Sequence, residues 1–367
     1  MKVLLLADIN SIHTRRWTAA LLAKGIRVGI FSLTPVKDRF PEEQDITVYV
    51  AKKGEREISD SILFRKSEYF TKIPAVRKCI RDFRPEILHA HYASSYGTLG
   101  AMSGFHPFVI SVWGSDVYDF PKQSVITRLI FRYTLKKADR LLSTSHVMAN
   151  EIGKYTRRNV TVVPFGIDPE VFKPLTDRNT PGRNEFVIGT VKSLEVIYGI
   201  EILLKAFGIL RNRLPAVPLR LVIAGGGTQE RNLKELAVNL GITDQVTFAG
   251  KVPHDRLPSI LSTFDVFVAL SRRESFGVAL LEASSCELPV VATDIDGFRE
   301  IIRDNVTGIL VPVGNPEASA TAIENLILNP DKRAVMGRNG RENVVHSFNW
   351  NDNVEQMFSI YQNLLRF

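Results

Sequence analysis

The stretch from Val266 to Thr293 constrains the fold more than any other part of the chain. It begins with an apolar run, Val266–Leu270, which is typical of a buried strand. A polar loop follows, and a run with helical spacing starts after Gly277. A second apolar run, Pro289–Ala292, comes directly afterwards. Strand, loop, helix and strand in this order predict one βαβ unit of a parallel sheet.

Two carboxylates lie in this unit, Glu274 in the loop and Glu282 in the predicted helix. In parallel sheets, ligands bind beyond the carboxyl ends of the strands, where helix N-termini present unpaired N–H groups. The loop and the start of the helix would therefore suit a phosphorylated ligand. Glutamates at such positions are more often solvated charges, so the two carboxylates alone do not establish a site.

The whole stretch resembles the E-x7-E signature of the retaining glycosyltransferases of family 4, also called glycosyl transferase group 1. Here the signature runs from Glu274 to Glu282 and encloses Ser275–Gly277. The runs Pro289–Thr293 and Asn305–Val311 are also similar to that family. The resemblance implies an α/β protein with the GT-B architecture, in which two Rossmann-like domains with parallel sheets face a central cleft.

The resemblance also implies a domain organisation. Residues 1–168 would form an acceptor-side domain, and residues 169–349 would form a domain that binds a nucleotide-sugar. Residues 350–367 have an amphipathic pattern, and in the resembled architecture such a terminal helix packs back on the first domain. The polar stretch Thr176–Asn184, with Pro and Gly, is typical of a linker.

Composition limits the class of protein. The 367 residues are enough for two ordinary domains, and 45% hydrophobic with 23% charged residues is typical of a soluble globular protein. Two cysteines, Cys79 and Cys286, provide no disulfide framework and favour a reducing compartment. The apolar run after Met1 ends at Asp8, so it predicts a first strand rather than a signal peptide or a membrane span. We therefore expect a cytoplasmic protein.

The charge is unevenly distributed along the chain. Through Asp168 there are 26 Lys and Arg against 16 Asp and Glu, a net charge of +10, whereas the remainder has 21 against 23, a net charge of −2. A basic first half could meet an anionic membrane surface or an anionic acceptor, although ordinary solubility charge explains it equally well. One hypothesis is peripheral docking on the cytoplasmic membrane, near a glycan or lipid-linked glycan acceptor. No recognised nucleic-acid module is visible, so we expect no nucleic-acid partner.

The first half opens with strand, loop, helix and strand but lacks the G-x-G-x-x-G fingerprint, which disfavours a nicotinamide-dependent dehydrogenase. Helical spacing begins at Trp17, so the preceding residues, including Ser11 and His13, are predicted to form the first loop. In the resembled family this loop is often Gly-rich and faces acceptor and donor. Ser11 and His13 are therefore acceptor-side candidates, although a histidine such as His13 is more often an ordinary loop residue than an acid/base group.

Two further acceptor-side candidates follow predicted strands. His91 stands at the carboxyl end of a strand, and Asp116 follows another. Asp116 could contact the acceptor or could simply cap the following turn. Trp113 stands where many members of the resembled family have a histidine near the donor sugar.

The second half contains a segment that resembles the family's Arg-x5-Lys-Gly segment, whose two cations neutralise the donor diphosphate. Lys192 stands for the first cation and Tyr198 for the second, so one charge is lost. Gly225 and Gly226 could let backbone N–H groups approach a phosphate, or could form a plain turn. The loop with Val252 resembles the family's loop near the nucleotide base.

The resemblance implies roles for these residues. Glu274 would position the donor sugar through its hydroxyls, Glu282 would bind the ribose hydroxyls, and Lys192 would counter the diphosphate charge. The loop between the two glutamates would supply the other donor contacts, from Ser275, Phe276 and Gly277. The family implies retention of the anomeric configuration. No Asp-x-Asp motif is assigned to the donor site, so we expect no essential metal and no cofactor beside the donor, a UDP- or GDP-sugar.

The main interpretation is therefore a glycosyltransferase of glycan, polysaccharide or glycolipid biosynthesis. Two other functions stay open. The unexpected Tyr198 and Trp113 would also suit a non-catalytic partner subunit that keeps the nucleotide-sugar fold. A sugar-nucleotide epimerase could use the same architecture without an acceptor.

Overall fold

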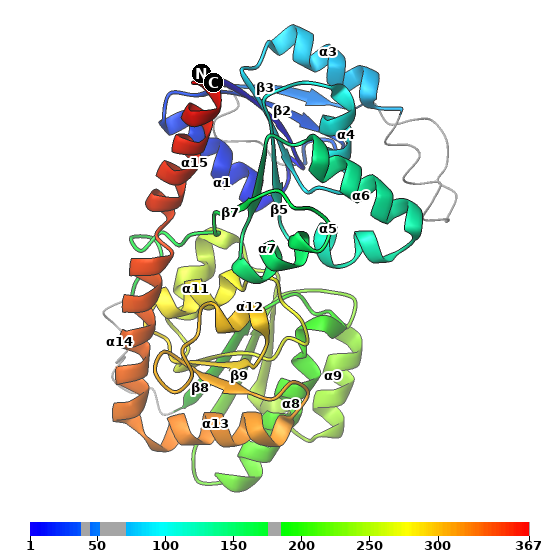
Figure 1. Ribbon diagram of the computed structural model, residues 1–367. Helices are drawn as coiled ribbons and strands as arrows, with labels where there is room; N and C mark the ends of the chain where they lie inside the picture. Colours follow the sequence, from blue (N-terminus) through cyan, green and yellow to red (C-terminus); the bar gives the residue numbers. More distant parts are fainter. Residues whose placement is uncertain (38–44, 52–70, 175–184, 367) are drawn as a thin grey trace. The chain divides into compact units, whose positions relative to one another are not determined.

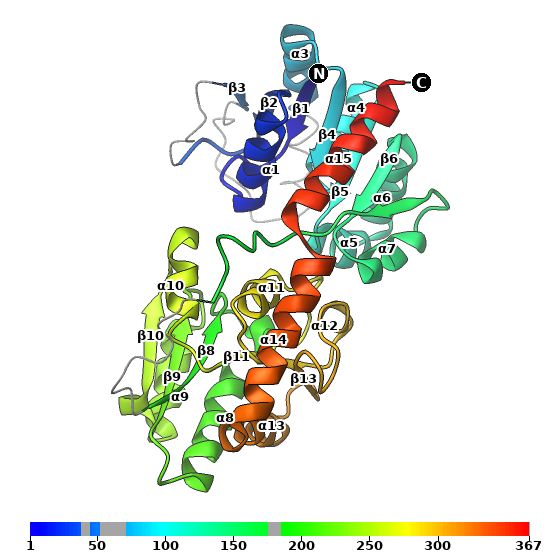
Figure 2. The same ribbon diagram turned by 90° about the vertical axis from the view of Figure 1, so that its left-hand side faces the viewer.

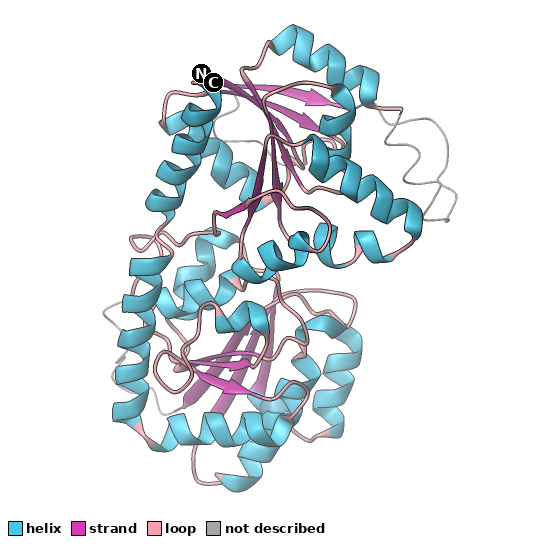
Figure 3. Ribbon diagram, in the orientation of Figure 1, coloured by secondary structure: helices cyan, strands magenta, loops and turns pink. Residues whose placement is uncertain are grey.

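The computed structural model describes residues 1–37, 45–51, 71–174 and 185–366. They fall into two compact units. Unit 1 runs to Pro164 and resumes at Asp352, and unit 2 is Phe165–Asn351. In each unit, helices cover both faces of a central sheet (Figures 1 and 3). The predicted linker, residues 176–184, lies outside the described residues.

Unit 1 is built on a parallel sheet. Within the described residues its strands are β1 (Lys2–Leu6), β2 (Arg27–Ser32), β3 (Ile46–Val50), β4 (Ile87–His91), β5 (Phe108–Val112), β6 (Arg140–Ser143) and β7 (Val160–Val162). They pair in the order β3-β2-β1-β4-β5-β6-β7, and each described pairing is parallel. The order reverses between β1 and β4, which is the place where open parallel sheets bind ligands.

The described helices of unit 1 are α1 (Ile12–Ala23), α3 (Ile73–Phe83), α4 (Tyr96–Ser103), α5 (Ser115–Tyr118), α6 (Val125–Lys137), α7 (His146–Gly153) and most of α15 (Trp350–Leu365). Figure 2 shows α1 and α15 side by side on one face of the sheet, where Lys24 forms an ion pair with Glu355. In the same views α3, α4 and α6 follow one another on the opposite face. None of the described helices is both long enough and apolar enough to cross a bilayer.

Most elements form where the sequence predicts them, but α1 begins earlier. The sequence placed its start at Trp17, whereas the structure starts it at Ile12. His13 therefore lies in the first turn of α1 and not in a loop. The only apolar residue of this first turn, Ile12, is exposed, and the buried residue is Thr14, so apolar spacing could not reveal the turn. Helix α7 is capped by Ser145, whose Oγ atom accepts a hydrogen bond of 3.1 Å from the N–H of Met148.

Unit 2 repeats the same plan. Within the described residues its strands are β8 (Phe186–Val191), β9 (Leu219–Ala224), β10 (Val246–Gly250), β11 (Val266–Ala269), β12 (Val290–Thr293) and β13 (Ile309–Val311). They pair in parallel in the order β10-β9-β8-β11-β12-β13, so the reversal lies between β8 and β11. Its described helices are α8 (Ile200–Arg213), α9 (Glu230–Asn239), α10 (Leu257–Leu261), α11 (Val278–Ser285), α12 (Asp296–Arg299), α13 (Pro316–Leu328) and α14 (Pro330–Ser347).

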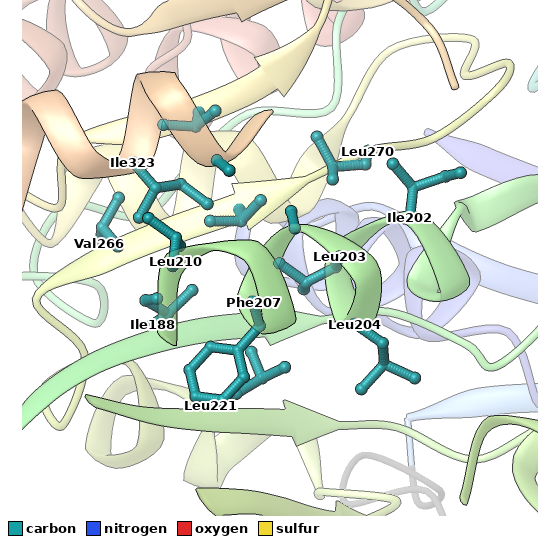
Figure 4. Packing of buried hydrophobic residues seen from close by; sticks show 14 of the residues in the cluster. Ile188, Ile202, Leu203, Leu204, Phe207, Leu210, Leu221, Val266, Leu270 and Ile323 are labelled. Atoms are coloured by element: carbon teal, nitrogen blue, oxygen red, sulfur yellow. The ribbon is translucent and has the colours of Figure 1, made fainter. Parts of the chain in front are cut away.

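The core of unit 2 lies between the sheet and α8. Phe207 and Leu210 of α8 are fully buried against strand residues such as Ile188 and Leu221, as Figure 4 shows. Ile323 of α13 belongs to the same cluster. Burying a large apolar side chain contributes about 1.5–3 kcal/mol, so this packing holds the strands in register. A rigid sheet in turn fixes the loops at its carboxyl edge.

A buried polar chain joins α15 to the sheet of unit 1. The Nδ1 atom of His89 on β4 lies 2.5 Å from the hydroxyl of Tyr361 on α15, and its Nε2 atom lies 2.8 Å from Ser111 Oγ on β5. Both His89 and Tyr361 are almost fully buried. His91 shares the same strand face, because the two imidazole centroids are 5.0 Å apart. The terminal helix is therefore anchored by specific hydrogen bonds as well as by apolar packing.

This polar chain predicts a loss of stability in acid. Burial lowers the pKa of His89 from 6.5 to about 3. Below pH 6.5 the unfolded chain therefore binds a proton at His89 that the folded unit does not bind. The contribution of His89 to the free energy of unfolding is complete above pH 6.5 and is lost as the pH falls towards 3. We expect a slope of about 1.4 kcal/mol per pH unit from this group. Urea unfolding at several pH values measures it. His89→Gln should flatten the slope, and the exposed-site control His346→Gln should not; equal slopes in all three proteins would contradict the assignment.

Candidate functional site

The carboxyl edge of the unit 2 sheet brings two predicted site residues together. Lys192 directly follows β8, and Glu274 lies in the loop after β11. These two strands flank the reversal of strand order, so their following loops separate and leave room above the sheet. Lys192 Nζ lies 2.6 Å from Glu274 Oε2, and the two side chains are only 10% and 17% exposed. The site thus contains a shielded cation and carboxylate in direct contact.

Two aromatic rings complete the surroundings of Lys192. Its Nζ atom lies 5.1 Å from the ring centroid of Tyr198 and 6.0 Å from that of Phe298. An ammonium group over a ring face is attracted by the ring quadrupole. Tyr198, which stands for the second cation in the sequence comparison, therefore presents its ring to the first. Of Lys192 and Tyr198, only Lys192 carries a positive charge.

The glycine run after β9 packs directly against Lys192. The φ of Gly225 is 154°, and a Cβ atom there would lie 1.8 Å from the carbonyl oxygen of Lys192. No other residue fits without moving the backbone. A Cβ on Gly226 would meet only the flexible side chain of Lys251, at 3.0 Å. The close approach thus gives Gly225 a packing role, whatever it also does for a ligand.

The second glutamate of the signature has a different partner. Glu282 on α11 is 5% exposed, and its Oε1 atom lies 2.9 Å from His254 Nε2. His254 follows β10 and packs edge-on against Phe172, whose ring centroid lies 5.4 Å away. A buried carboxylate without a partner would be costly, so His254 both satisfies and orients Glu282.

The entry into α11 is shaped by close packing. Gly277 precedes the helix with a φ of 111°, and a Cβ there would lie 2.9 Å from the ring of Phe298. Phe276 is buried, and its ring packs edge-on against Phe348 at 5.6 Å. The side chain of Phe276 is therefore used in packing, and only its backbone N–H group is left for a ligand. The half-buried Ser275 lies in the same turn.

Five of the candidates of unit 2 fall into two groups. Lys192, Tyr198 and Glu274 are in one cluster, with Gly225 beneath it. Glu282 forms a second group with His254. Val252 is half-buried in the loop after β10, two residues before His254, and no described contact joins it to either group.

Unit 1 gathers three aromatic side chains at its own strand reversal. His91 ends β4, His13 lies in α1 after β1, and Trp113 follows β5. The ring centroid of Trp113 lies 4.3 Å from that of His91 and 5.7 Å from that of His13. His91 Nδ1 also lies 3.4 Å from Thr14 Oγ1. Burial, followed by the neighbouring His89 and His13, lowers the pKa of His91 well below its usual value, so it is neutral at physiological pH.

The carboxylate of Asp116 accepts hydrogen bonds from backbone N–H groups. Its Oδ1 atom accepts hydrogen bonds from the N–H groups of Trp113 and Gly114, at 3.3 and 2.9 Å, and its Oδ2 atom accepts one of 2.8 Å from Ala93. Burial raises the pKa of Asp116, and these bonds partly offset that rise. Asp116 thus ties the loops after β4 and β5 together. Ser11 occupies the N-cap position of α1, and its side chain makes no capping hydrogen bond.

Sequence reasoning missed two residues of the unit 2 site. His254 and Phe298 touch the site residues Glu282, Lys192 and Gly277, but neither stands in the E-x7-E signature or in the cationic segment. A histidine in a loop after a strand gave no signal of its partner, which is 28 residues away. The position of Phe298 after β12, a neighbour of β11, was the only hint that it could reach the loop of Glu274.

The pairing of His254 with Glu282 predicts a difference between two substitutions. His254→Phe keeps a ring against Phe172 but removes the donor, so it should lower the free energy of unfolding by about 1–3 kcal/mol. His254→Gln can still donate to Glu282 and should cost clearly less. Urea unfolding of the full chain provides the comparison. If both variants were as stable as the parent, the proposed pairing would be wrong.

Comparisons with known proteins identify the family of this chain. The chain matches the family model for glycosyl transferases group 1 over residues 174–343 and that for glycosyl transferase 4-like proteins over residues 2–145. It is 33% identical to the D-inositol 3-phosphate glycosyltransferase of Corynebacterium urealyticum over 221 residues, which are 57% of this chain and 52% of the relative. The aligned part thus spans about half the length of that relative.

Solved structures share the fold along the whole chain. Sucrose-phosphate synthase from Thermosynechococcus elongatus superposes with a TM-score of 0.87 at 22% identity, covering 100% of this chain and 99% of that one. HepE of Anabaena, solved with UDP, gives 0.81 at 19% identity and covers 99% and 100%. One family model matches most of unit 1 and the other most of unit 2. This chain therefore belongs to the glycosyl transferases of group 1, the family 4-like glycosyltransferases with the GT-B fold.

Proposed function

We propose that this protein transfers a sugar from a UDP- or GDP-sugar to a hydroxyl group of an acceptor, with retention of the anomeric configuration. The observation that carries the proposal is the shielded Lys192–Glu274 pair at the strand reversal of unit 2. This is the place where parallel sheets bind ligands, and the pair offers one group for phosphate and one for hydroxyls. The printed names of the relatives and the UDP bound by HepE support a nucleotide-sugar donor.

The ion pair suggests how the donor enters. The diphosphate would replace the Glu274 carboxylate as the partner of Lys192, since phosphate oxygens carry the charge that an ammonium group prefers. Glu274 would then be free to accept hydrogen bonds from the hydroxyls of the sugar. The N-terminus of α11, which begins at Val278, would face the distal phosphate with N–H groups that have no intrahelical acceptor.

With the donor held in this way, the proposed reaction has three changes. The bond between the anomeric carbon and the phosphate oxygen breaks, and the acceptor oxygen forms a new bond to that carbon on the same face of the sugar. The acceptor proton passes to the departing phosphate. Lys192 stabilises the negative charge that develops on that phosphate, which lowers the barrier more than it stabilises the bound donor. Glu274 acts by holding the sugar in the reactive orientation.

The remaining donor contacts follow the second group of residues. Glu282, oriented by His254, would accept hydrogen bonds from the ribose hydroxyls. Gly226 and Val252 would lie near the phosphates and the base, and Ser275 with the N–H groups of Phe276 and Gly277 near the sugar and the distal phosphate. For the acceptor we propose a glycan or lipid-linked glycan of polysaccharide or glycolipid biosynthesis, with Ser11, His13, His91 and Asp116 on its side.

Substitutions of Glu274 and Glu282 should have different effects on the reaction. We expect Glu274→Ala to reduce turnover at least ~10²-fold, because the sugar loses its orientation. Glu282→Ala should mainly raise the Kd for the donor, because a ribose contact is lost. Steady-state kinetics and titration calorimetry separate the two effects. Glu235→Ala, at an exposed ion pair on α9, serves as the control. Full turnover in the Glu274 variant would remove its assigned role.

The donor has to be identified first, by calorimetry with UDP-, GDP- and ADP-sugars followed by hydrolysis and transfer assays. Transfer with the same anomeric configuration in donor and product supports the proposal. Binding without turnover in the presence of candidate acceptors would instead favour a non-catalytic partner subunit. Release of an epimerised sugar without an acceptor would favour an epimerase.

We also expect activity without a divalent metal. The only Asp-x-Asp sequence after a described strand of unit 2 is Asp294 to Asp296, and both carboxylates bond to Arg299. The hydrogen bond from Arg299 lowers the pKa of Asp294, as expected for a carboxylate already paired with a cation. EDTA-treated protein should keep its transfer rate, and added Mn²⁺ should not raise it. Inactive EDTA-treated protein that Mn²⁺ restores would show that a metal is required.

A further inference from the structure

Helix α6 of unit 1 exposes an apolar stripe on its outer face. Val125, Ile126, Leu129 and Tyr133 are 68%, 57%, 61% and 43% exposed. They are spaced so that they share one side of the helix, while Phe131 and Leu135 on the opposite side are fully buried in unit 1. Every other described helix has at most one exposed large apolar side chain. The stripe on α6 is therefore a local concentration and not the ordinary scatter of a protein surface.

Cations border this stripe. Arg128, Arg132, Lys136 and Lys137 are all exposed, and α6 contains no acidic residue. Among the described residues none of the four forms an ion pair, and Lys137 lies with its Nζ atom 5.7 Å from the ring centroid of Tyr133. Apolar side chains flanked by unpaired Lys and Arg are the composition of helices that lie in the interface of a bilayer.

The charges on α6 indicate which kind of partner could bind this face. A second copy of the chain would bring α6 against α6, with cations opposite cations and no carboxylate on either helix, which disfavours self-association. An anionic lipid surface offers both an apolar layer for the stripe and negative charge for its borders. The net charge of +10 on residues 1–168 extends the same attraction over the rest of unit 1.

The position of α6 links this face to the candidate acceptor side. The chain leaves β5 at Trp113, passes through α5 and starts α6 at Val125, where Ser124 and Thr127 form a capping box. A crossover helix begins at the carboxyl edge of the sheet and runs back towards the amino edge. Val125 and Ile126 therefore lie at the edge that carries His91 and Trp113.

We propose that the outer face of α6 docks this protein on an anionic lipid surface, with the apolar stripe in the headgroup region. Docking in this way would present the carboxyl edge of unit 1 to molecules held in the membrane. The docking does not depend on sugar transfer, so vesicle binding can fail or succeed separately from the proposed activity.

Co-sedimentation of the full chain with vesicles tests the proposal. Vesicles of phosphatidylcholine with phosphatidylglycerol should bind the protein at low salt, and phosphatidylcholine alone should bind it weakly. Arg128→Gln with Arg132→Gln should reduce the partition coefficient about tenfold or more. Lys78→Gln with Arg81→Gln on α3 removes the same charge from the same unit. This control should leave the partition coefficient within about twofold of the parent value.

The apolar contribution has its own matched pair. Leu129→Ser should weaken binding about fivefold, whereas Leu328→Ser, at a side chain on α13 with a similar exposure of 58%, should not. Absence of salt-sensitive binding by the parent protein would overturn the proposal, as would equal losses in the α3 control. Self-association that Leu129→Ser abolishes without changing vesicle binding would assign this face to a second copy instead.

Discussion

The site depends on a constraint of parallel sheets. Crossover connections between parallel strands are right-handed. In unit 2, β9 and β10 are added on one side of β8, and the chain then returns to add β11 on the other side of β8. The loops after β8 and β11 then turn to opposite faces of the sheet. Lys192 and Glu274 come from those two loops, and their contact of 2.6 Å exists because the strands between which the order reverses are neighbours.

The Lys192–Glu274 pair also determines the electrostatics of the proposed donor site. An ammonium group shielded from water needs a partner, and here a carboxylate and two aromatic rings supply it. A diphosphate can replace the carboxylate without leaving Lys192 unpaired. The ring of Tyr198 cannot neutralise a phosphate. In the proposed donor complex, the N-terminus of α11 would therefore compensate more of the phosphate charge than it would beside two cations.

The parts of the fold that the sequence predicted well depend on local patterns. Apolar runs identified the strands, and the glutamate spacing identified the unit that contains Glu274 and Glu282. The predictions failed where the pattern was not local or not apolar. The first turn of α1 buries Thr14 and exposes its one apolar residue, Ile12, so His13 was placed in a loop. The partners of Glu282 and Lys192 are 28 and 82 residues away along the chain. Periodic patterns relate only residues that are a few positions apart, so they could not predict these pairs.

The amino-acid sequence by itself determined the order of strands and helices, the family, and the chemical groups available at the carboxyl edges of the sheets. Tertiary structure alone decided which of these groups touch. It paired Lys192 with Glu274 and Glu282 with His254, and it turned Asp116 towards backbone N–H groups. It also left the apolar stripe of α6 uncovered. The physical reason is that hydrogen bonds, ion pairs and burial depend on distances between atoms, and only the packing of the sheets and helices brings residues from distant parts of the chain within those distances.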